Sequence, residues 1–376
     1  MEWLELLRGA VAGILAFIAV PVLIYFLLIN TSYLVMIVLA AVDFVAQRRR
    51  IPFAGREELM RSRTMPGISV VAPMHNEEVG IRVAVVRKRN SGRSDSINVG
   101  VNLAREDLVL FVDSDSILDP GALLAVSRPF IEDPISTVAA GGVIRAVNGC
   151  RVKGGRVLEV RMPGNPLADI QVMEYLRAFH LGRAGWSRIN ALLLISGAFG
   201  VFRRDALVTV GGLDASSIGE DFELVMRLHR TFRKQRRPYR DMLGSPRYGR
   251  LGLVAVPYYW LFELIAPLLE LAGLVLIALG FALGLVTVQY FVLFMLVAYA
   301  YAMIVTLAAV TIEELSYHKY PRWRDLGITL WAVVLENLGY RQLTAWWRME
   351  GWVASLLGRR QQWGTMTRSG FTEVDG

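Results

Sequence analysis

Two carboxylates follow a buried-type strand in the stretch LVLFVDSDSILDP, residues Leu108 to Pro120. Five apolar residues lead directly to Asp113 and Asp115. On an extended segment, residues i and i+2 point to the same side, so the two carboxylates can converge on one cation. Hard oxygen ligands suit Mg²⁺ or Mn²⁺, which commonly bridge protein carboxylates to substrate phosphates. The alternative is an ordinary strand end, whose Asp residues form a turn and cap the following helix.

Three other stretches place polar groups near predicted element ends. MHNEE (Met74 to Glu78) ends an earlier predicted strand. GED (Gly219 to Asp221) opens a predicted helix, and by itself it is typical of a helix cap with acids at the positive end of the dipole. RNSGRSDSINVGVNLA supplies small and basic residues before a helix, which suits a diphosphate but is also common in ordinary loops.

Composition indicates a membrane protein. The chain has 376 residues, enough for two or three domains, with 54% hydrophobic residues. Its mean hydropathy of +0.41 is too high for a wholly soluble protein. The formal charge of +8 suits nucleic acid or a cytoplasmic membrane face; the apolar runs favour the membrane, and no nucleic-acid partner is expected. With Cys150 as the only cysteine and four scattered histidines, neither a disulfide nor a zinc site is predicted.

The chain divides into four predicted regions. Residues 1–47 hold a transmembrane segment that is either one long helix or a hairpin of two short ones; we favour one crossing. Arginines that follow it put the next domain in the cytoplasm. Residues 48–250 alternate β-rich runs (ISVVAP, LVLFVD, TVAAGGVI) with helical stretches, which predicts an α/β domain with a mostly parallel sheet and ligands at its strands' carboxyl ends. Residues 251–311 hold two more spans, Tyr258–Phe281 and Tyr290–Val310, and residues 312–376 hold interfacial amphipathic helices and a tail.

Taken in order, these stretches resemble membrane-integrated family 2 glycosyltransferases, the inverting group that contains cellulose, hyaluronan and poly-N-acetylglucosamine synthases. The matching stretches are VVAPMHNEE, RNSGRSDSINVGVNLA, LVLFVDSDSILDPGALL, ISGAFGVFRRDALVTVGGLD and GEDFELVMRLHR. The resemblance implies a GT-A-like (Rossmann-like) cytoplasmic domain with N- and C-terminal transmembrane helices, in a multi-pass protein of the cell inner membrane.

The resemblance also implies roles for individual residues. Asp113 and Asp115 match the motif that holds Mg²⁺ or Mn²⁺ against the diphosphate of a nucleotide-sugar, here a UDP-sugar. Asp221 matches the general base that takes a proton from the acceptor hydroxyl. The implied nucleotide-sugar contacts are Asn76, Glu77, Arg93, Asp95 and Asn98, and the implied acceptor contacts are Gly197, Ala198, Phe199 and Glu220.

Two departures from the family pattern matter. Between NEE and RNSGR only VGIRVAVVRK intervenes, whereas a second strand with its crossover needs roughly 30 residues or more. The Gln-Arg-Trp type motif is also absent before the membrane. Either segments of the natural protein are missing from this sequence, or the gene has lost them and encodes an inactive relative. Because DSD, NEE and GED remain intact, we favour omission, which predicts Cα–Cα gaps well above about 3.8 Å within residues 80–88 and 238–244.

The functional expectation is therefore a glycosyltransferase that passes a sugar to a saccharide or lipid acceptor with inversion. It would either synthesise a polysaccharide processively or glycosylate a lipid or short acceptor. Partner subunits are compatible with both activities. The alternative is a catalytically inactive membrane scaffold or nucleotide-sensing relative. Glu263 and Glu270 lie seven residues apart on a predicted membrane helix. They either line a polysaccharide exit path or pair with an interfacial arginine such as Arg341 or Arg348.

Overall fold

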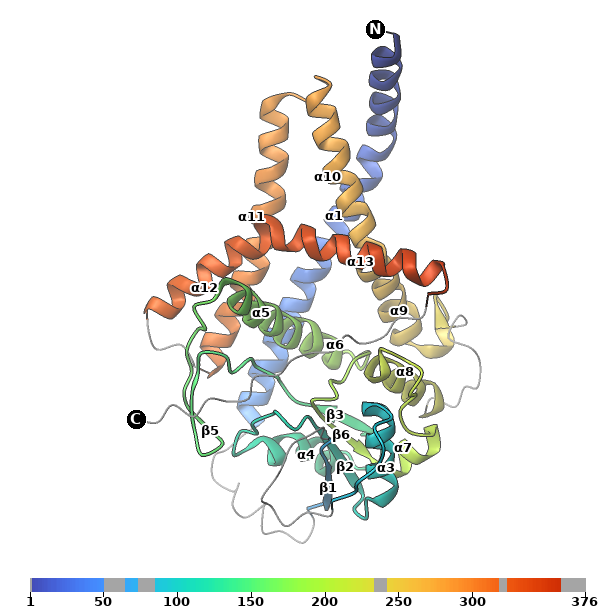
Figure 1. Cartoon of the computed structure of the whole chain (residues 1–376), viewed down its shortest axis with the longest axis vertical. Helices are drawn as coiled ribbons and strands as arrows, with labels where there is room; N and C mark the ends of the chain where they lie inside the picture. Colours follow the sequence, from blue (N-terminus) through green and yellow to red (C-terminus); the bar gives the residue numbers. More distant parts are fainter. Residues whose placement is uncertain (1, 51–64, 74–84, 233–241, 318–322, 360–376) are drawn as a thin grey trace.

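The computed structural model describes residues 2–50, 65–73, 85–232, 242–317 and 323–359. Three long helices project from one end of a globular α/β part, and two further helices lie across their base (Figure 1). The projecting helices are α1 (Glu2–Arg50), α10 (Ala266–Ala282) and α11 (Val288–Tyr317), and the crossing helices are α12 (Trp323–Leu335) and α13 (Arg341–Leu356).

The N-terminal segment is one continuous helix, as predicted, and not a hairpin. Helix α1 runs through Pro21 and through the polar residues at 30–32 without a break. Within the described part of the chain, one helical stretch, Leu251–Ala282, is long and apolar enough to cross a membrane, with a hydropathy of 2.3. It includes the predicted span Tyr258–Phe281 but begins earlier, through η4 (Leu251–Ala255), α9 (Val256–Tyr258) and η5 (Tyr259–Leu264). The other two membrane spans stay predictions.

The central sheet is mixed, which corrects the expectation of a mostly parallel one. Its order is β1-β2-β6-β3, formed by Ile68–Val71, Leu108–Val112, Phe199–Arg203 and Ala139–Gly141. Strands β1 and β2 are parallel, but β6 is antiparallel to both of its neighbours. The chain reaches β6 from helices α5 (Pro166–Leu176) and α6 (Ala184–Arg188), which lie between the sheet and the projecting helices (Figure 1). It therefore enters the sheet at the end where β2 leaves it.

Strand β2 is the centre of the globular core, because all five of its residues are buried. Val109 and Phe111 pack on the side of α3 (Arg93–Leu103), α7 (Arg204–Val210) and α8 (Glu220–Phe232). Leu108 and Leu110 pack on the opposite side, against α4 (Ala122–Glu132). A continuous apolar run is the pattern of a strand that is covered on both faces. Each such side chain contributes roughly 1.5–3 kcal/mol by its burial.

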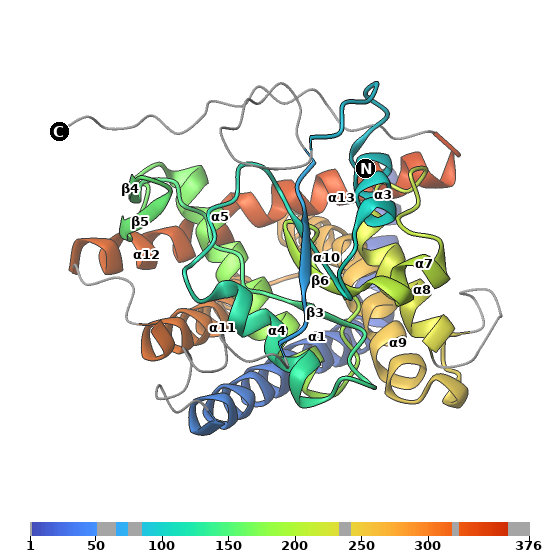
Figure 2. The same ribbon diagram turned by 90° about the horizontal axis from the view of Figure 1, so that it is seen from below.

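The globular part is attached to the helical part through two apolar clusters. Met173 and Leu176 of α5 pack with Val310 of α11 and Val333 of α12. Trp186 of α6 packs with residues of α1 and α9. Seen from below, α12 and α13 follow one another along one side of the molecule (Figure 2). They are joined through η6 (Glu336–Tyr340), which is kinked at Leu338 and Gly339.

The remaining elements are short. A hairpin pairs β4 (Arg151–Lys153) with β5 (Arg156–Glu159), the π-helical segment η1 (Arg177–Arg183) connects α5 to α6, and η3 (Pro246–Tyr248) precedes η4.

Candidate functional site

The register of the sheet brings distant polar residues to one edge. Strands β1 and β2 are parallel, so their carboxyl ends meet at the same edge. Val112, the last residue of β2, pairs with Phe199, the first residue of β6. Consequently Asp113, just after β2, and Gly197, just before β6, lie beside one another. This edge is where ligands bind in open α/β sheets.

Arg93 lies at the centre of three carboxylates at this edge. Its Nε is 3.2 Å and its Nη2 is 3.1 Å from Asp113 Oδ1. Its Nη1 donates to Glu220 Oε1 at 2.8 Å and lies 3.7 Å from Asp221 Oδ1. Burial opposes the positive charge, but Asp113, Asp221 and Glu220 together raise the pKa of Arg93 above its usual value. The guanidinium therefore stays charged and holds the acidic groups together.

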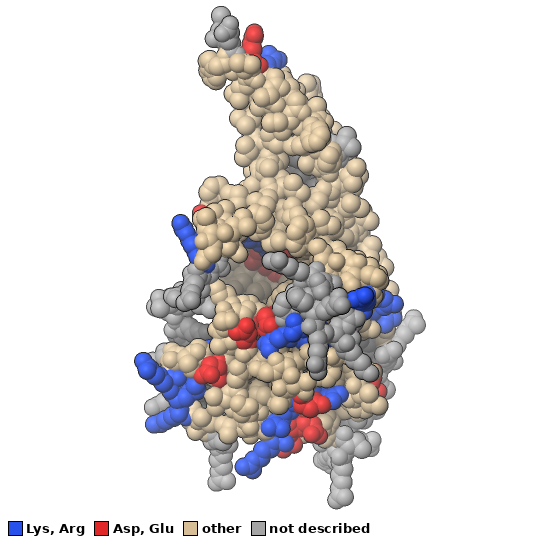
Figure 3. Space-filling view, turned by 90° about the vertical axis from the view of Figure 1, so that its right-hand side faces the viewer, with Lys and Arg blue, Asp and Glu red and all other residues tan. Residues whose placement is uncertain are grey.

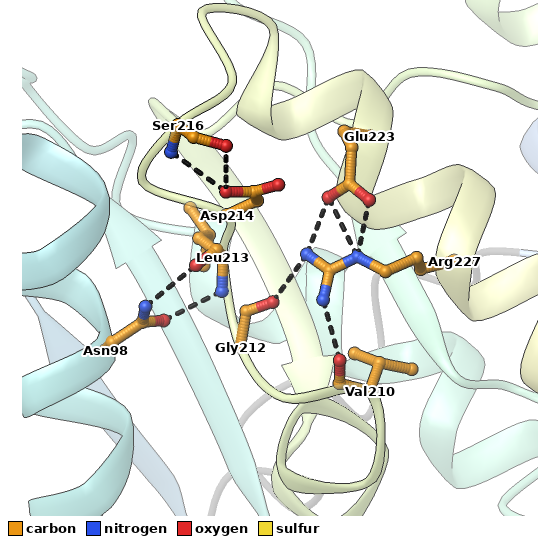
Figure 4. Close-up of polar contacts among 8 residues, drawn as sticks. All are labelled: Asn98, Val210, Gly212, Leu213, Asp214, Ser216, Glu223 and Arg227. Atoms are coloured by element: carbon orange, nitrogen blue, oxygen red, sulfur yellow. Dashed lines mark hydrogen bonds and ion pairs between the residues drawn. The ribbon is translucent and has the colours of Figure 1, made fainter.

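A second polar network fixes the start of α8, which carries Glu220 and Asp221 (Figure 4). Arg227 forms a bidentate contact from Nε to Glu223, at 2.6 and 2.8 Å. The same guanidinium donates to the carbonyl oxygens of Val210 (2.6 Å) and Gly212 (2.7 Å). Because these carbonyls belong to the end of α7 and the loop after it, the network ties α8 to that loop and sets where its first turn points.

Asn98 of α3 is hydrogen-bonded to the same loop. Its amide donates to the carbonyl of Leu213 at 2.8 Å and accepts from the Leu213 N–H at 2.7 Å (Figure 4). This pairing gives Asn98 a structural role, and its predicted contact with a nucleotide-sugar stays a prediction.

We expect Asn98→Ala to lower the stability of the globular part by about 1–3 kcal/mol, because it leaves both Leu213 backbone groups unpaired. Thermal unfolding of the purified chain measures this loss, and nucleotide titration of the folded variant separates it from binding. If the variant melts like the wild type but loses nucleotide affinity, Asn98 contacts the ligand and does not hold the loop.

Asp221 has the environment of a base. Its Oδ2 accepts a hydrogen bond from the Gly197 N–H at 2.8 Å. Burial raises the pKa of the Asp221 carboxyl above its usual value, and Glu220 and Asp113 add to this effect, whereas Gly197 and Arg93 oppose it. A carboxylate whose pKa is shifted toward neutrality is a stronger proton acceptor than an ordinary surface Asp.

Gly197 permits the close approach of Arg93 and Asp221. A Cβ atom at this position would lie 2.6 Å from Asp221 Oδ1 and 2.7 Å from Arg93 Nη1. We expect Gly197→Ala to lower transfer about 10²-fold by displacing these groups. Gly219→Ala is the matched control, because a Cβ at Gly219 meets nothing within 4 Å. Turnover assays of both variants test the expectation, and equal activity of the two would contradict it.

The two aspartates after β2 lie on a turn. The Ser116 N–H donates to the Asp113 carbonyl at 3.0 Å, so the segment is not extended as the i, i+2 argument assumed. Asp113 is half-buried and Asp115 is exposed. The convergence of their carboxylates on one cation stays a prediction.

The donor set nevertheless fits Mg²⁺ or Mn²⁺. These ions prefer oxygen ligands and are often held by one or two carboxylates together with substrate phosphates. Asp113 and Asp115 supply such oxygens at the strand end. In the described parts of the chain, no group of three or more His, Cys, Asp and Glu side chains forms a ready-made metal site. A site here would need substrate oxygens to complete it.

The other predicted site residues are distributed as follows. Asp95 accepts from Ser91 and pairs with Lys88, and both contacts lower its pKa. Ala198 lies between Gly197 and β6, whereas Phe199 is buried against the α4 side of the sheet. That packing explains Phe199 without a ligand, and its acceptor contact stays a prediction. Asn76 and Glu77, and most of the windows 80–88 and 238–244, lie outside the described residues.

One functional candidate had no signal in the sequence. The Arg183 guanidinium packs 3.8 Å above the ring of Phe179. Burial lowers the pKa of Arg183, while the charges of Tyr259 and Asp221 partly restore it. Neither residue belongs to a recognisable motif; they lie four positions apart within η1, whose helical turn brings them together.

The structure shows a partner for one of the two acids predicted on a membrane helix, Glu263 and Glu270. Glu270 pairs with Arg341 of α13 at 2.8 Å, which is one of the two predicted alternatives. This contact joins a projecting helix to a crossing helix.

Comparisons with known proteins match the part of the chain that carries these residues. Residues 68–236 match the model of a family described as glycosyltransferase like family 2. The poly-beta-1,6-N-acetyl-D-glucosamine synthase of Staphylococcus aureus strain COL is 27% identical over 142 residues, which cover 38% of this chain and 31% of that protein. The synthase of Staphylococcus epidermidis is 26% identical over 140 residues, covering 37% of this chain and 30% of the relative. The match thus spans about a third of these curated relatives.

Among solved structures, the mannosyltransferase PcManGT from Pyrobaculum calidifontis in complex with GDP-Man and Mn²⁺ aligns with a TM-score of 0.39 and 14% identity. The alignment covers 82% of this chain and 99% of that one.

Proposed function

We propose, because residues 68–236 match the model of a family described as glycosyltransferase like family 2, that the protein transfers a sugar from a nucleotide-sugar to an acceptor hydroxyl with inversion. The donor is a UDP-sugar and the acceptor is a saccharide or a lipid. The match to the family model and the similarity to poly-beta-1,6-N-acetyl-D-glucosamine synthases support this assignment.

The observation that carries the proposal is the cluster of Asp113, Glu220 and Asp221 around Arg93 at the carboxyl ends of β1 and β2. An ordinary structural ion pair joins one acidic and one basic side chain at the surface. Here three carboxylates and one guanidinium meet at the edge of the sheet. They come from three separate segments: the start of α3, the turn after β2 and the start of α8. A cluster of this kind, in which the pKa values of Arg93 and Asp221 are both raised, is typical of functional sites.

Each residue then has a chemical task. Asp221 accepts the proton of the acceptor hydroxyl, whose oxygen attacks the anomeric carbon of the donor. The bond from that carbon to the diphosphate breaks, and the nucleoside diphosphate leaves with the electron pair. Attack opposite the leaving group inverts the anomeric centre. Arg93 contributes positive charge beside the diphosphate, while Glu220 orients the acceptor next to Asp221. Mg²⁺ or Mn²⁺ held by Asp113 and Asp115 would supply charge that stabilises the leaving diphosphate.

We place the globular domain in the cytoplasm and the projecting helices in the inner membrane. Their surface is almost without charge between the tip and the base on the face in Figure 3. The helix Leu251–Ala282 has the length and hydropathy of a membrane span. Helices α12 and α13, with their tryptophans and arginines, would then lie at the interface. The same face is hollowed between the helical and globular parts, which offers an acceptor a route from the membrane side (Figure 3).

A second candidate is a membrane scaffold that binds nucleotide without turnover. It is favoured by the short link between NEE and RNSGR and by the missing Gln-Arg-Trp type motif. Partner subunits would be expected for such a scaffold, and they are also compatible with a polysaccharide synthase.

The test is release of UDP by the purified full-length chain in detergent, with a panel of UDP-sugars and either Mg²⁺ or Mn²⁺. Turnover with one donor, abolished by a chelator, is the expected result. Nucleotide binding without turnover on any donor or acceptor would identify the scaffold instead.

A further inference from the structure

The guanidinium of Arg93 lies among all three carboxylates of the acidic cluster. It lies within 4 Å of one oxygen of Asp113, one of Glu220 and one of Asp221. Three formal negative charges face one positive charge, so the cluster still attracts cations. A divalent ion that bound to Asp113 in this arrangement would, however, lie beside a fixed like charge.

The side chain is held in this place by close packing that permits only glycine opposite it. A Cβ at Gly197 would lie 2.7 Å from Arg93 Nη1, so the backbone of Gly197 forms a wall against the guanidinium. Nη2 is buried and lies 3.1 Å from Asp113 Oδ1, but among the described residues it makes no well-aligned hydrogen bond. Because a buried N–H group without an aligned acceptor is costly, a ligand oxygen that offered better alignment would be favoured there.

Arg93 is nevertheless packed on one side only in part, because some of its side chain stays exposed. It is the first residue of α3, it follows Gly92 in a left-handed conformation (φ 93°), and its side chain is 29% exposed. A long side chain at a helix start can reorient by rotating about its own bonds, without any change in the fold.

We propose that Arg93 is a resident cation of this site, which excludes the divalent metal until the diphosphate of the donor arrives. The proposal rests on the proposed function and adds an order of binding to it. A diphosphate brings enough negative charge for both cations, so Arg93 can turn its Nη2 toward a phosphate oxygen while the metal joins Asp113. The carboxylates are thus kept from binding a metal in the absence of nucleotide, and metal and donor enter together.

The experiment measures Mn²⁺ binding to the full-length protein in detergent by the loss of the electron paramagnetic resonance signal of free Mn²⁺. Titrations are run without nucleotide, with UDP and with GDP, and Mn²⁺–nucleotide solutions without protein supply the background. The wild type should bind Mn²⁺ weakly without nucleotide, and its affinity for Mn²⁺ should rise about tenfold or more when a nucleotide is present.

Three variants test the role of Arg93. Arg93→Gln should bind Mn²⁺ without nucleotide about tenfold or more tightly than the wild type, because the competing charge is removed. Arg93→Lys should lie between the two, since it keeps the charge but cannot reach all three carboxylates. Arg128→Gln changes the net charge equally at an exposed pair with Glu132 on α4 and should match the wild type. Thermal unfolding of each variant establishes that it is folded.

The outcomes separate the two proposals. If Arg93→Gln binds Mn²⁺ no better than the wild type without nucleotide, or if the wild type binds Mn²⁺ equally with and without nucleotide while turning over, the resident-cation proposal is overturned and the proposed function stands. If no variant binds Mn²⁺ under any condition, the proposed metal site fails as well.

Discussion

Replacing Asp221 by Asn is expected to lower the turnover of sugar transfer by about 10²–10⁴-fold, the usual contribution of a positioned general base. Asn keeps an oxygen that can accept the Gly197 N–H, which donates at 2.8 Å in the wild type, so the local fold should be preserved. Only the ability to take the acceptor proton is lost. Because the base acts on the acceptor, the affinity for nucleotide should change little.

A calorimetric titration with UDP and a turnover assay, performed on the same preparation, measure both effects. Asp205→Asn is the matched control, since Asp205 is an exposed residue of α7 that pairs with Arg203 far from the acidic cluster. An equal loss of nucleotide binding in Asp221→Asn would reassign this residue to the donor site or to the fold.

The pKa of Asp221 adds a pH dependence to this prediction. Burial raises that pKa, so turnover should fall as the pH drops through the raised value, where the base becomes protonated. A carboxyl whose folded pKa lies above its unfolded pKa also costs stability at higher pH, because folding favours its protonated form. Asp221→Asn should therefore be more stable than the wild type near pH 7. This difference in stability should shrink as the pH falls below the unfolded pKa, because residue 221 is then neutral in the folded and unfolded states of both proteins. Melting curves across this range measure the difference.

The sequence predicted the parts of the site that depend on local pattern. The apolar run before Asp113 predicted strand β2, and GED predicted the start of α8, since a strand and a capped helix start are determined by neighbouring residues. The direction of β6 was not predicted. Its pairing with β2 joins residues about ninety positions apart, and the hydrophobic pattern of a buried strand is the same in either direction.

The arrangement of charges was even less accessible. The sequence indicated Arg93 only as an implied nucleotide-sugar contact. Its partner Glu220 lies 127 positions away in the sequence, so this contact could not be predicted from local pattern. Nothing in either segment indicates that one guanidinium meets three carboxylates. The same holds for Arg177 and Glu336, which meet only because α5 packs against α12.

That last pair leads to the largest stability effect that we expect. Arg177, at the start of η1, forms an ion pair with Glu336 of η6 and donates from Nη1 to Thr306 Oγ1 of α11 at 3.3 Å. It thus connects the globular part to both the projecting and the crossing helices. Glu336 is 4% exposed, and its second oxygen, Oε2, has no hydrogen-bond partner among the residues that the structure describes. Without Arg177 its charge would be buried and unpaired.

Arg177→Met should therefore destabilise the protein by about 3–5 kcal/mol, the usual cost of removing one partner of a buried ion pair. For a chain of this size the apparent melting temperature should fall by about 5–10 °C or more. Arg203→Met removes an arginine that pairs with the exposed Asp205 and donates to the carbonyls of Pro134 and Ile135, and it should cost about 1–2 kcal/mol. Both are measured by thermal unfolding in the same detergent.

The double variant Arg177→Met with Glu336→Gln separates the charge from the packing. If the cost arises from the stranded carboxylate, removing that charge should restore most of the lost stability, and the two changes will be strongly non-additive. If the double variant is as unstable as Arg177→Met alone, the loss comes instead from the hydrogen bond to Thr306 and the contacts of the arginine stem. If Arg177→Met melts like Arg203→Met, the pair does not hold the junction, and the apolar contacts of Met173 and Leu176 with Val333 and Val310 must carry it.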